Sequence, residues 1–233
     1  MNGILLIDKD EDCTSYDVIR EIKRLFKGEK IGHTGTLDPI ATGLLILCIG
    51  KATKLSSIFM NLEKEYVAKM KLGAVSDTLD ADGTIKIVKE NCSVDLDSLK
   101  NVLRKYIGEI EQIPPMYSAK KVQGKKLYQY ARKGLSIERK PIRIRISELE
   151  LIQFSKDEAE FRVRISKGGY VRVLCDDIGR DLGCGGYMLS LRRTKIGEFD
   201  VKNAIRVDEL LSLDNPLSKL CDISKVREFL KEK

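Results

Sequence analysis

The apolar positions of the first fifty residues form two continuous runs with a helical pattern between them. Residues 3–7 and 44–49 are almost entirely apolar, which is typical of buried strands. One apolar helix face recurs between them, at Val18, Ile19, Ile22, Leu25 and Phe26. Thr14, with Asp17 three residues later, predicts a capping box at the start of this helix. We therefore expect a strand, a helix, a loop and a second strand in this order.

The rest of the chain mixes alternating and helical patterns. Alternation predicts strands over residues 65–72, 84–88, 143–154, 160–166 and 188–196. Helical spacing predicts helices over residues 95–107 and 170–182, and from residue 207 onward. The elements lack the regular βαβα order of a doubly wound sheet. The pattern therefore predicts an α+β fold, with a mixed, largely antiparallel central β-sheet flanked by helices.

The loop expected at residues 32–43 combines turn residues with unusual chemistry. It holds the only histidine of the chain, His33, and one carboxylate, Asp38, with no other charge between residues 31 and 50. Pro39 stiffens the turn directly after the acid. An Asp-Pro pair ordinarily marks a turn. The apolar surroundings favour the further interpretation that this carboxylate is held in a defined position.

Composition narrows the class of protein. The 233 residues are 42% hydrophobic and 33% charged, which is typical of a folded domain, and the net charge of +7 suits a polyanionic partner. Six scattered cysteines and a single histidine give no local zinc spacing. Neither a signal peptide nor a membrane-spanning run is present in the sequence, so we expect a cytoplasmic, reduced protein with no membrane association.

Two segments that resemble ligand-binding motifs lack residues that those motifs require. Gly50-Lys51 is followed by Ala52, where a phosphate loop needs Ser or Thr. Residues 78–83 resemble the start of a calcium loop, but the first position is Thr78 and the twelfth is Lys89. We therefore expect no cofactor and no metal.

Four short segments carry the remaining candidate chemistry. They are residues 32–43, Lys64-Glu65-Tyr66, residues 77–83 and residues 166–172. Further motifs accompany them, at Asn2-Gly3, Asp8-Lys9, Thr14-Ser15, residues 50–54, residues 112–120, residues 124–128, residues 176–179 and Leu191-Arg192-Arg193. In this order, over about residues 2–197, they resemble the bacterial tRNA pseudouridine-55 synthases, the TruB family.

The resemblance implies the pseudouridine synthase fold and an RNA isomerase. Such an enzyme detaches uracil from the ribose of uridine 55 in the T arm of tRNA and rejoins it through carbon 5, without cofactor or metal. The base must leave the folded RNA to be reached. The resemblance makes Asp38 the catalytic acid residue, which either attacks or deprotonates the nucleoside. It makes Arg172 the partner that keeps Asp38 ionised, and Asp80 the residue that holds Arg172.

The resemblance also assigns substrate contacts. Tyr66 stacks on the flipped base and could take the carbon-5 proton. Tyr170 and Leu191 form the pocket wall, and His33 enters the RNA loop. Basic residues in or beside the matched motifs are candidate contacts to the RNA backbone, namely Lys51, Lys54, Lys120, Lys121, Lys125, Lys126, Arg192 and Arg193.

Domain organisation and alternatives complete these expectations. We expect a catalytic domain over residues 1–200 and a short helical tail over residues 201–233, with no PUA domain. We expect a monomer that binds the T stem-loop of tRNA. Two alternatives stay open, which are a synthase for a different RNA uridine and a non-catalytic tRNA-binding or tRNA-folding protein. Asp38, Tyr66 and Arg172 together favour an enzyme, because a binding module does not need all three.

Overall fold

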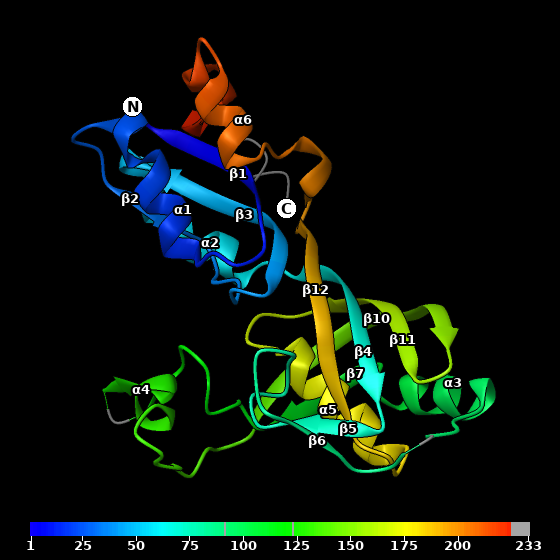
Figure 1. Ribbon diagram of the computed structural model, residues 1–233. Helices are drawn as coiled ribbons and strands as arrows, with labels where there is room; N and C mark the ends of the chain where they lie inside the picture. The colour runs from blue at the N-terminus through cyan, green and yellow to red at the C-terminus, as the bar shows by residue number, and fades with distance from the viewer. Residues whose placement is uncertain (91, 123, 225–233) are drawn as a thin grey trace. The chain divides into compact units, whose positions relative to one another are not determined.

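The computed structural model describes residues 1–90, 92–122 and 124–224, and its chain divides into two compact units (Figure 1). The first unit comprises Met1–Glu65 and Arg192–Lys233, and the second comprises Tyr66–Leu191. Two strands, β4 (Lys64–Leu72) and β12 (Gly186–Ile196), contain the points at which the chain passes from one unit to the other. The division expected after residue 200 stays a prediction, and residues 225–233 of the expected tail lie outside the described residues.

The first unit is built around a sheet in which β1 is paired on both sides. Its strands and α-helices are β1 (Gly3–Lys9), α1 (Ser15–Ile22), β2 (Ile31–His33), β3 (Ala41–Ile49), α2 (Ser56–Asn61), β13 (Phe199–Asp200), α6 (Val207–Ser212) and β14 (Cys221–Asp222). Its 3-10 helices are η1 (Lys23–Phe26), η2 (Gly50–Leu55), η3 (Val201–Asn203) and η4 (Pro216–Lys219). The strand order begins β14-β1-β3-β12, and β1 is antiparallel to both β3 and β14.

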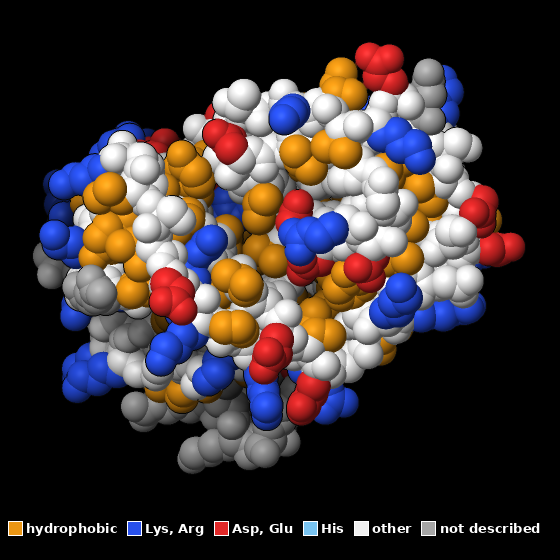
Figure 2. Space-filling model, turned by 90° about the horizontal axis from the view of Figure 1, so that it is seen from below, with side chains coloured by type: hydrophobic (Ala, Val, Ile, Leu, Met, Phe, Trp, Pro, Cys, Tyr) orange, Lys and Arg blue, Asp and Glu red, His pale blue; other side chains and the backbone are white. Residues whose placement is uncertain are grey.

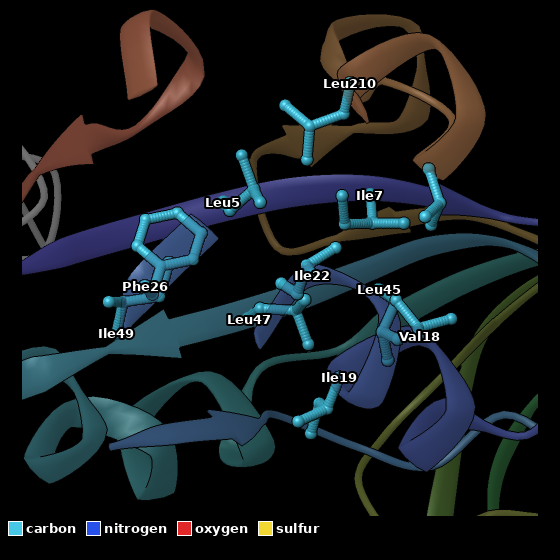
Figure 3. Packing of buried hydrophobic residues seen from close by; sticks show 11 residues of the cluster. Leu5, Ile7, Val18, Ile19, Ile22, Phe26, Leu45, Leu47, Ile49 and Leu210 are labelled. Carbon is cyan, nitrogen blue, oxygen red and sulfur yellow. The ribbon is translucent and has the colours of Figure 1, made fainter. Parts of the chain in front are cut away.

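Both faces of β3 are covered, which explains its unbroken apolar sequence. Leu45, Leu47 and Ile49 belong to a buried cluster with residues of α1, β1 and α6, shown in Figure 3. The alternate residues belong to a second buried cluster, which includes Phe59 of α2. Complete burial of each such side chain contributes roughly 1.5–3 kcal/mol.

The predicted capping box of α1 is confirmed. The Asp17 backbone N–H donates to Thr14 Oγ1 at 3.1 Å, and the Thr14 N–H donates to Asp17 Oδ2 at 3.0 Å. The cap fixes where the helix starts, and so it places Ser15 as the first helical residue.

The second unit holds the other part of the sheet, in the order β12-β4-β11-β10-β7. Its further elements are β5 (Ala74–Ser76), β6 (Ile85–Ile87), α3 (Leu96–Lys105), β7 (Gly108–Gln112), β8 (Lys121–Val122), β9 (Lys125–Lys126), α4 (Leu127–Ala131), β10 (Ile142–Ser155), β11 (Glu158–Ile165) and α5 (Val171–Asp181). Strand β10 is antiparallel to both β11 and β7. Every second residue of β11 is buried, as its alternating sequence predicts.

The expected fold class is confirmed, because antiparallel pairings dominate a mixed α and β structure. The strand expected at residues 84–88 is shorter, at Ile85–Ile87, and the helix expected at residues 95–107 is Leu96–Lys105. Among the described residues, no helix combines the length and the apolar character needed to cross a membrane.

Candidate active site

Asp38 lies in the first unit, on the tight connection between β2 and β3. Its two neighbours in the chain differ in burial: the preceding residue, Leu37, is 3% exposed, and the following residue, Pro39, is exposed. The Ala41 N–H donates to the Asp38 carbonyl at 3.0 Å and closes a turn around the acid. Asp38 itself is partly exposed, and its backbone is anchored in this turn.

A buried hydroxyl holds the residue that precedes Asp38. Ser15 Oγ accepts a hydrogen bond from the Leu37 N–H at 2.9 Å and lies 3.3 Å from the Leu37 carbonyl, to which it donates. Ser15 is 2% exposed and is the first residue of α1. The capped start of α1 therefore fixes the backbone next to Asp38.

A buried ammonium holds the residue that follows Asp38. Lys9 is fully buried, and its Nζ donates to the carbonyls of Asp10 and Cys13 at 2.7 Å and of Pro39 at 3.2 Å. Burial lowers the pKa of Lys9, while the neighbouring Cys13, Asp10 and Asp38 raise it. The charge of Asp38 is therefore part of the electrostatic environment of Lys9.

The two adjacent arginines of β12 have different surroundings. Arg192 is partly exposed and forms a bidentate ion pair with Asp8, in which Nη1 donates to Oδ1 at 3.0 Å and Nη2 donates to Oδ2 at 2.7 Å. Arg193 is 1% exposed, and it donates to the carbonyls of Leu44 at 2.7 Å and Gly35 at 3.1 Å. A buried guanidinium that donates to the backbone carbonyls of two other residues is not accessible to an RNA phosphate, so the expected contact with the RNA backbone does not fit Arg193.

The other site candidates of the first unit lie on its surface. His33 ends β2 and is partly exposed, and the Gly35 N–H donates to its Nδ1 at 3.4 Å. Lys51 and Lys54 are exposed on η2, directly after β3.

In the second unit, Asp80 and Arg172 form a buried ion pair. Arg172 Nη1 lies 2.8 Å from Asp80 Oδ2, and the two residues are 5% and 2% exposed. The other carboxylate oxygen of Asp80 accepts from Thr78 Oγ1 at 2.5 Å and from the Asp82 N–H at 3.3 Å. Arg172 Nη2 also donates to the Tyr117 carbonyl at 2.5 Å. These bonds hold the guanidinium in one orientation at the second position of α5.

Gln112 fixes the backbone of Tyr170, the residue that caps α5. The Tyr170 N–H donates to Gln112 Oε1 at 3.0 Å, and Gln112 Nε2 donates to the Tyr170 carbonyl at 3.3 Å. Gln112 is 1% exposed at the end of β7. Gln112 lies in one of the matched motifs, but its role is not visible in the sequence because these bonds join residues 58 positions apart.

The remaining candidates of the second unit lie on three elements. Tyr66 is partly exposed on β4, and Leu191 is 9% exposed on β12. The hairpin of β8 and β9 carries Lys121, Lys125 and Lys126, and Lys120 directly precedes it. Figure 2 shows Lys and Arg side chains spread over one face of the molecule, with acidic side chains between them.

The structure thus distributes the candidates over both units. The proposed pair of Asp38 and Arg172 joins residues of different units and stays a prediction, as do the functional roles of the candidates.

Comparison with known proteins identifies the relatives of this chain. The family model of the TruB family pseudouridylate synthase N-terminal domain matches residues 23–171, and that of the tRNA pseudouridylate synthase B C-terminal domain matches residues 172–231. The tRNA pseudouridine synthase B of Aquifex aeolicus (strain VF5) is 49% identical, over 93% of this chain and 76% of the relative. The protein of the same name from Francisella philomiragia subsp. philomiragia is 44% identical, over 97% of this chain and 76% of the relative.

Comparison with solved structures shows a shared fold. A crystal structure of a Cbf5-Nop10-Gar1 complex contains a chain with a TM-score of 0.71 and 28% identity, matched over 93% of this chain. This chain spans 55% of the length of that one. Sequence and fold therefore place the protein among the pseudouridylate synthases. Within that class, the chain belongs to the TruB family.

Proposed function

We propose that this protein converts uridine 55 in the T stem-loop of tRNA to pseudouridine in the cytoplasm, as a monomer and without metal or cofactor. The observation that carries the proposal is the 49% identity to a tRNA pseudouridine synthase B over 93% of the chain. The anchored Asp38 turn agrees with it, because catalysis requires a reacting group held in place.

In the proposed reaction, Asp38 acts as a carboxylate on an extruded nucleoside. The bond between ribose C1′ and uracil N1 breaks, the base rotates, and a bond forms between C1′ and C5. The proton on C5 leaves and N1 gains one, so the atoms balance without a co-reactant. Attack and deprotonation by Asp38 both require its ionised form.

The other candidates receive supporting roles. Arg172 pairs with Asp38, while Asp80 orients Arg172 through the buried ion pair at 2.8 Å. Tyr66 stacks on the flipped uracil and is a candidate acceptor for the C5 proton. Tyr170 and Leu191 form the walls that grip the base. His33 fills space in the RNA loop, as stacking side chains do in single-stranded RNA recognition.

Exposed and partly exposed lysines hold the RNA backbone. Lys51 and Lys54 on η2, together with Lys120, Lys125 and their neighbours at β8 and β9, are the proposed phosphate contacts. Arg192 remains in this set because it is partly exposed, whereas Arg193 is left out.

The decisive experiment uses an unmodified tRNA transcript. The protein is incubated with it, and pseudouridine is mapped by sequencing, with a transcript that carries cytidine at position 55 as the control. We expect modification at position 55 alone. Modification at another uridine would favour a synthase of different specificity, and tight binding without any product would favour a non-catalytic tRNA-binding protein.

A further inference from the structure

We propose that Arg193 is a positioning residue for Asp38, whose buried guanidinium clamps the two ends of the turn that carries the acid. The inference rests on the proposed function, because the catalytic role of Asp38 comes from there. All residues that carry it belong to the first unit.

The clamp is defined by two hydrogen bonds from one rigid group. Arg193 Nη2 donates to the carbonyl of Gly35, three residues before Asp38, at 3.1 Å. Arg193 Nε donates to the carbonyl of Leu44, in β3 after the turn, at 2.7 Å. Since the guanidinium is planar, these two bonds fix the separation of the two carbonyls.

Close backbone packing holds Arg193 itself in place. Gly43 has φ +99°, and a Cβ at this position would lie 2.3 Å from the Arg193 carbonyl oxygen. No side chain fits there, so β3 passes β12 at the distance that only glycine permits. The Arg193 side chain then extends to Gly35, whose own Cβ position would lie 3.7 Å from Nη1.

The cost of burying the Arg193 charge indicates a role beyond filling space in the core. A charge that is 1% exposed is costly to bury, and an apolar side chain of similar volume often serves stability equally well. The side-chain hydrogen bonds of this arginine go to the backbone carbonyls of Gly35 and Leu44, which lie before and after Asp38 in the chain. Displacement of a catalytic group by about 1 Å can cost about a hundredfold in rate, so fixing this turn has a direct kinetic value.

Two substitutions test the clamp. Arg193→Met removes the charge at similar length, and Arg193→Lys keeps the charge but not the planar fork. We expect Arg193→Met to lower the single-turnover rate constant per folded molecule by about thirtyfold to a hundredfold, while Kd for tRNA changes by less than about threefold. Arg193→Lys restores part of the rate. Arg20→Met, on the exposed surface of α1, serves as the matched control and retains the wild-type rate.

Hydrogen exchange tests the clamp without reference to activity. In free Arg193→Met, the amides of residues 34–43 exchange at least about tenfold faster relative to the amides of the β1–β3 ladder. If the wild type makes no pseudouridine, the proposed function fails and the exchange pattern still decides on the clamp. If Arg193→Met does not fold, the same two measurements on Arg193→Lys decide. Wild-type rate and wild-type exchange in the folded variant would overturn the inference.

Discussion

Asp38 depends on side chains that fix its backbone from several directions. Ser15 holds the preceding residue, Lys9 holds the following one, and Arg193 holds both ends of the turn. These three side chains are buried. A turn fixed in the free protein needs little ordering when substrate binds, so less binding energy is spent on positioning the acid.

The first prediction concerns the charge of Asp38. Asp38→Asn keeps the shape of the side chain but removes the ionised form, so we expect pseudouridine formation to fall below detection. Binding of tRNA should stay within about threefold of the wild type, because contacts to phosphate supply most of the affinity. Sequencing of the product and filter binding measure the two quantities. Asp214→Asn, at an exposed position, is the control, and retained turnover in Asp38→Asn would remove the acid from its proposed role.

The second prediction concerns the buried ion pair of the second unit. Asp80→Ala leaves the Arg172 charge buried without its carboxylate, which should lower the free energy of unfolding by about 3–5 kcal/mol. Urea denaturation followed by circular dichroism measures it. Asp208→Ala breaks an exposed ion pair with Arg206 and should leave the unfolding midpoint unchanged. A loss below about 1 kcal/mol in Asp80→Ala would show that the pair is not important for stability.

At the scale of residues, the sequence predicted which side chains are candidates for chemistry better than it predicted their burial and hydrogen-bond partners. The motif pattern pointed to Asp80 and Arg172 as partners, and the structure pairs them. It gave no role to Ser15 or Gln112, because their bonds join residues 22 and 58 positions apart. The sequence favoured Arg193 as a contact to the RNA backbone, whereas its side chain is buried. The sequence did contain a signal for the burial of one arginine. Successive residues of a strand point to opposite faces of the sheet, so two adjacent arginines do not lie on the same face.

At the scale of elements, local signals predicted α1 and the buried strands well, but the helix expected from residue 207 onward ends at Ser212 and is followed by η4 and β14. The capping box and apolar face of α1 lie within a few turns of chain, and β3 is a long apolar run. Strand β7 has the sequence Gly-Glu-Ile-Glu-Gln, with one apolar residue, and it exists because it pairs with β10. The sequence of this edge strand has little apolar alternation, so the strand could not be predicted without knowledge of its pairing with β10.

The third prediction concerns the pH dependence of α5. Burial raises the pKa of Asp177 to about 6, a shift that Arg180 opposes and Asp176 reinforces. The unfolded value is near 3.9, so the folded state binds the proton more tightly. The stabilisation from this group is therefore complete below pH 4 and is lost as pH rises from 4 through 6.

Asp177→Asn, which stays neutral, should consequently be more stable than the wild type at pH 7 by about 1–3 kcal/mol. The advantage should nearly vanish at pH 4. Urea unfolding at both pH values measures it. Asp97→Asn, on the exposed surface of α3, is the control, and an equal advantage at both pH values would contradict the assignment to ionisation.

At the scale of the whole molecule, the net charge of +7 favours tRNA binding, and contacts to phosphate make this binding depend on salt. The logarithm of the association constant should fall linearly with the logarithm of salt concentration. Each lost phosphate contact should reduce the slope by about 0.7–0.9. Lys51→Gln combined with Lys54→Gln should thus reduce the slope by roughly 1.5, and Lys100→Gln on α3 should leave it unchanged. Titrations by fluorescence anisotropy at several salt concentrations measure the slopes, and a flat response of the wild type would indicate an interface without important phosphate contacts.

The discontinuous first unit has a consequence for synthesis on the ribosome. The second unit is one uninterrupted stretch of chain, whereas the first combines both ends of the sequence. Translation runs from the N-terminus, so Tyr66–Leu191 can fold while the first unit still lacks residues 192–196 of β12 and the whole of α6. Asp38 is made early, but Arg193 emerges more than 150 residues later. The turn that carries Asp38 is therefore completed only after the whole second unit has been synthesised, and a nascent chain that lacks residue 193 has no clamp on this turn.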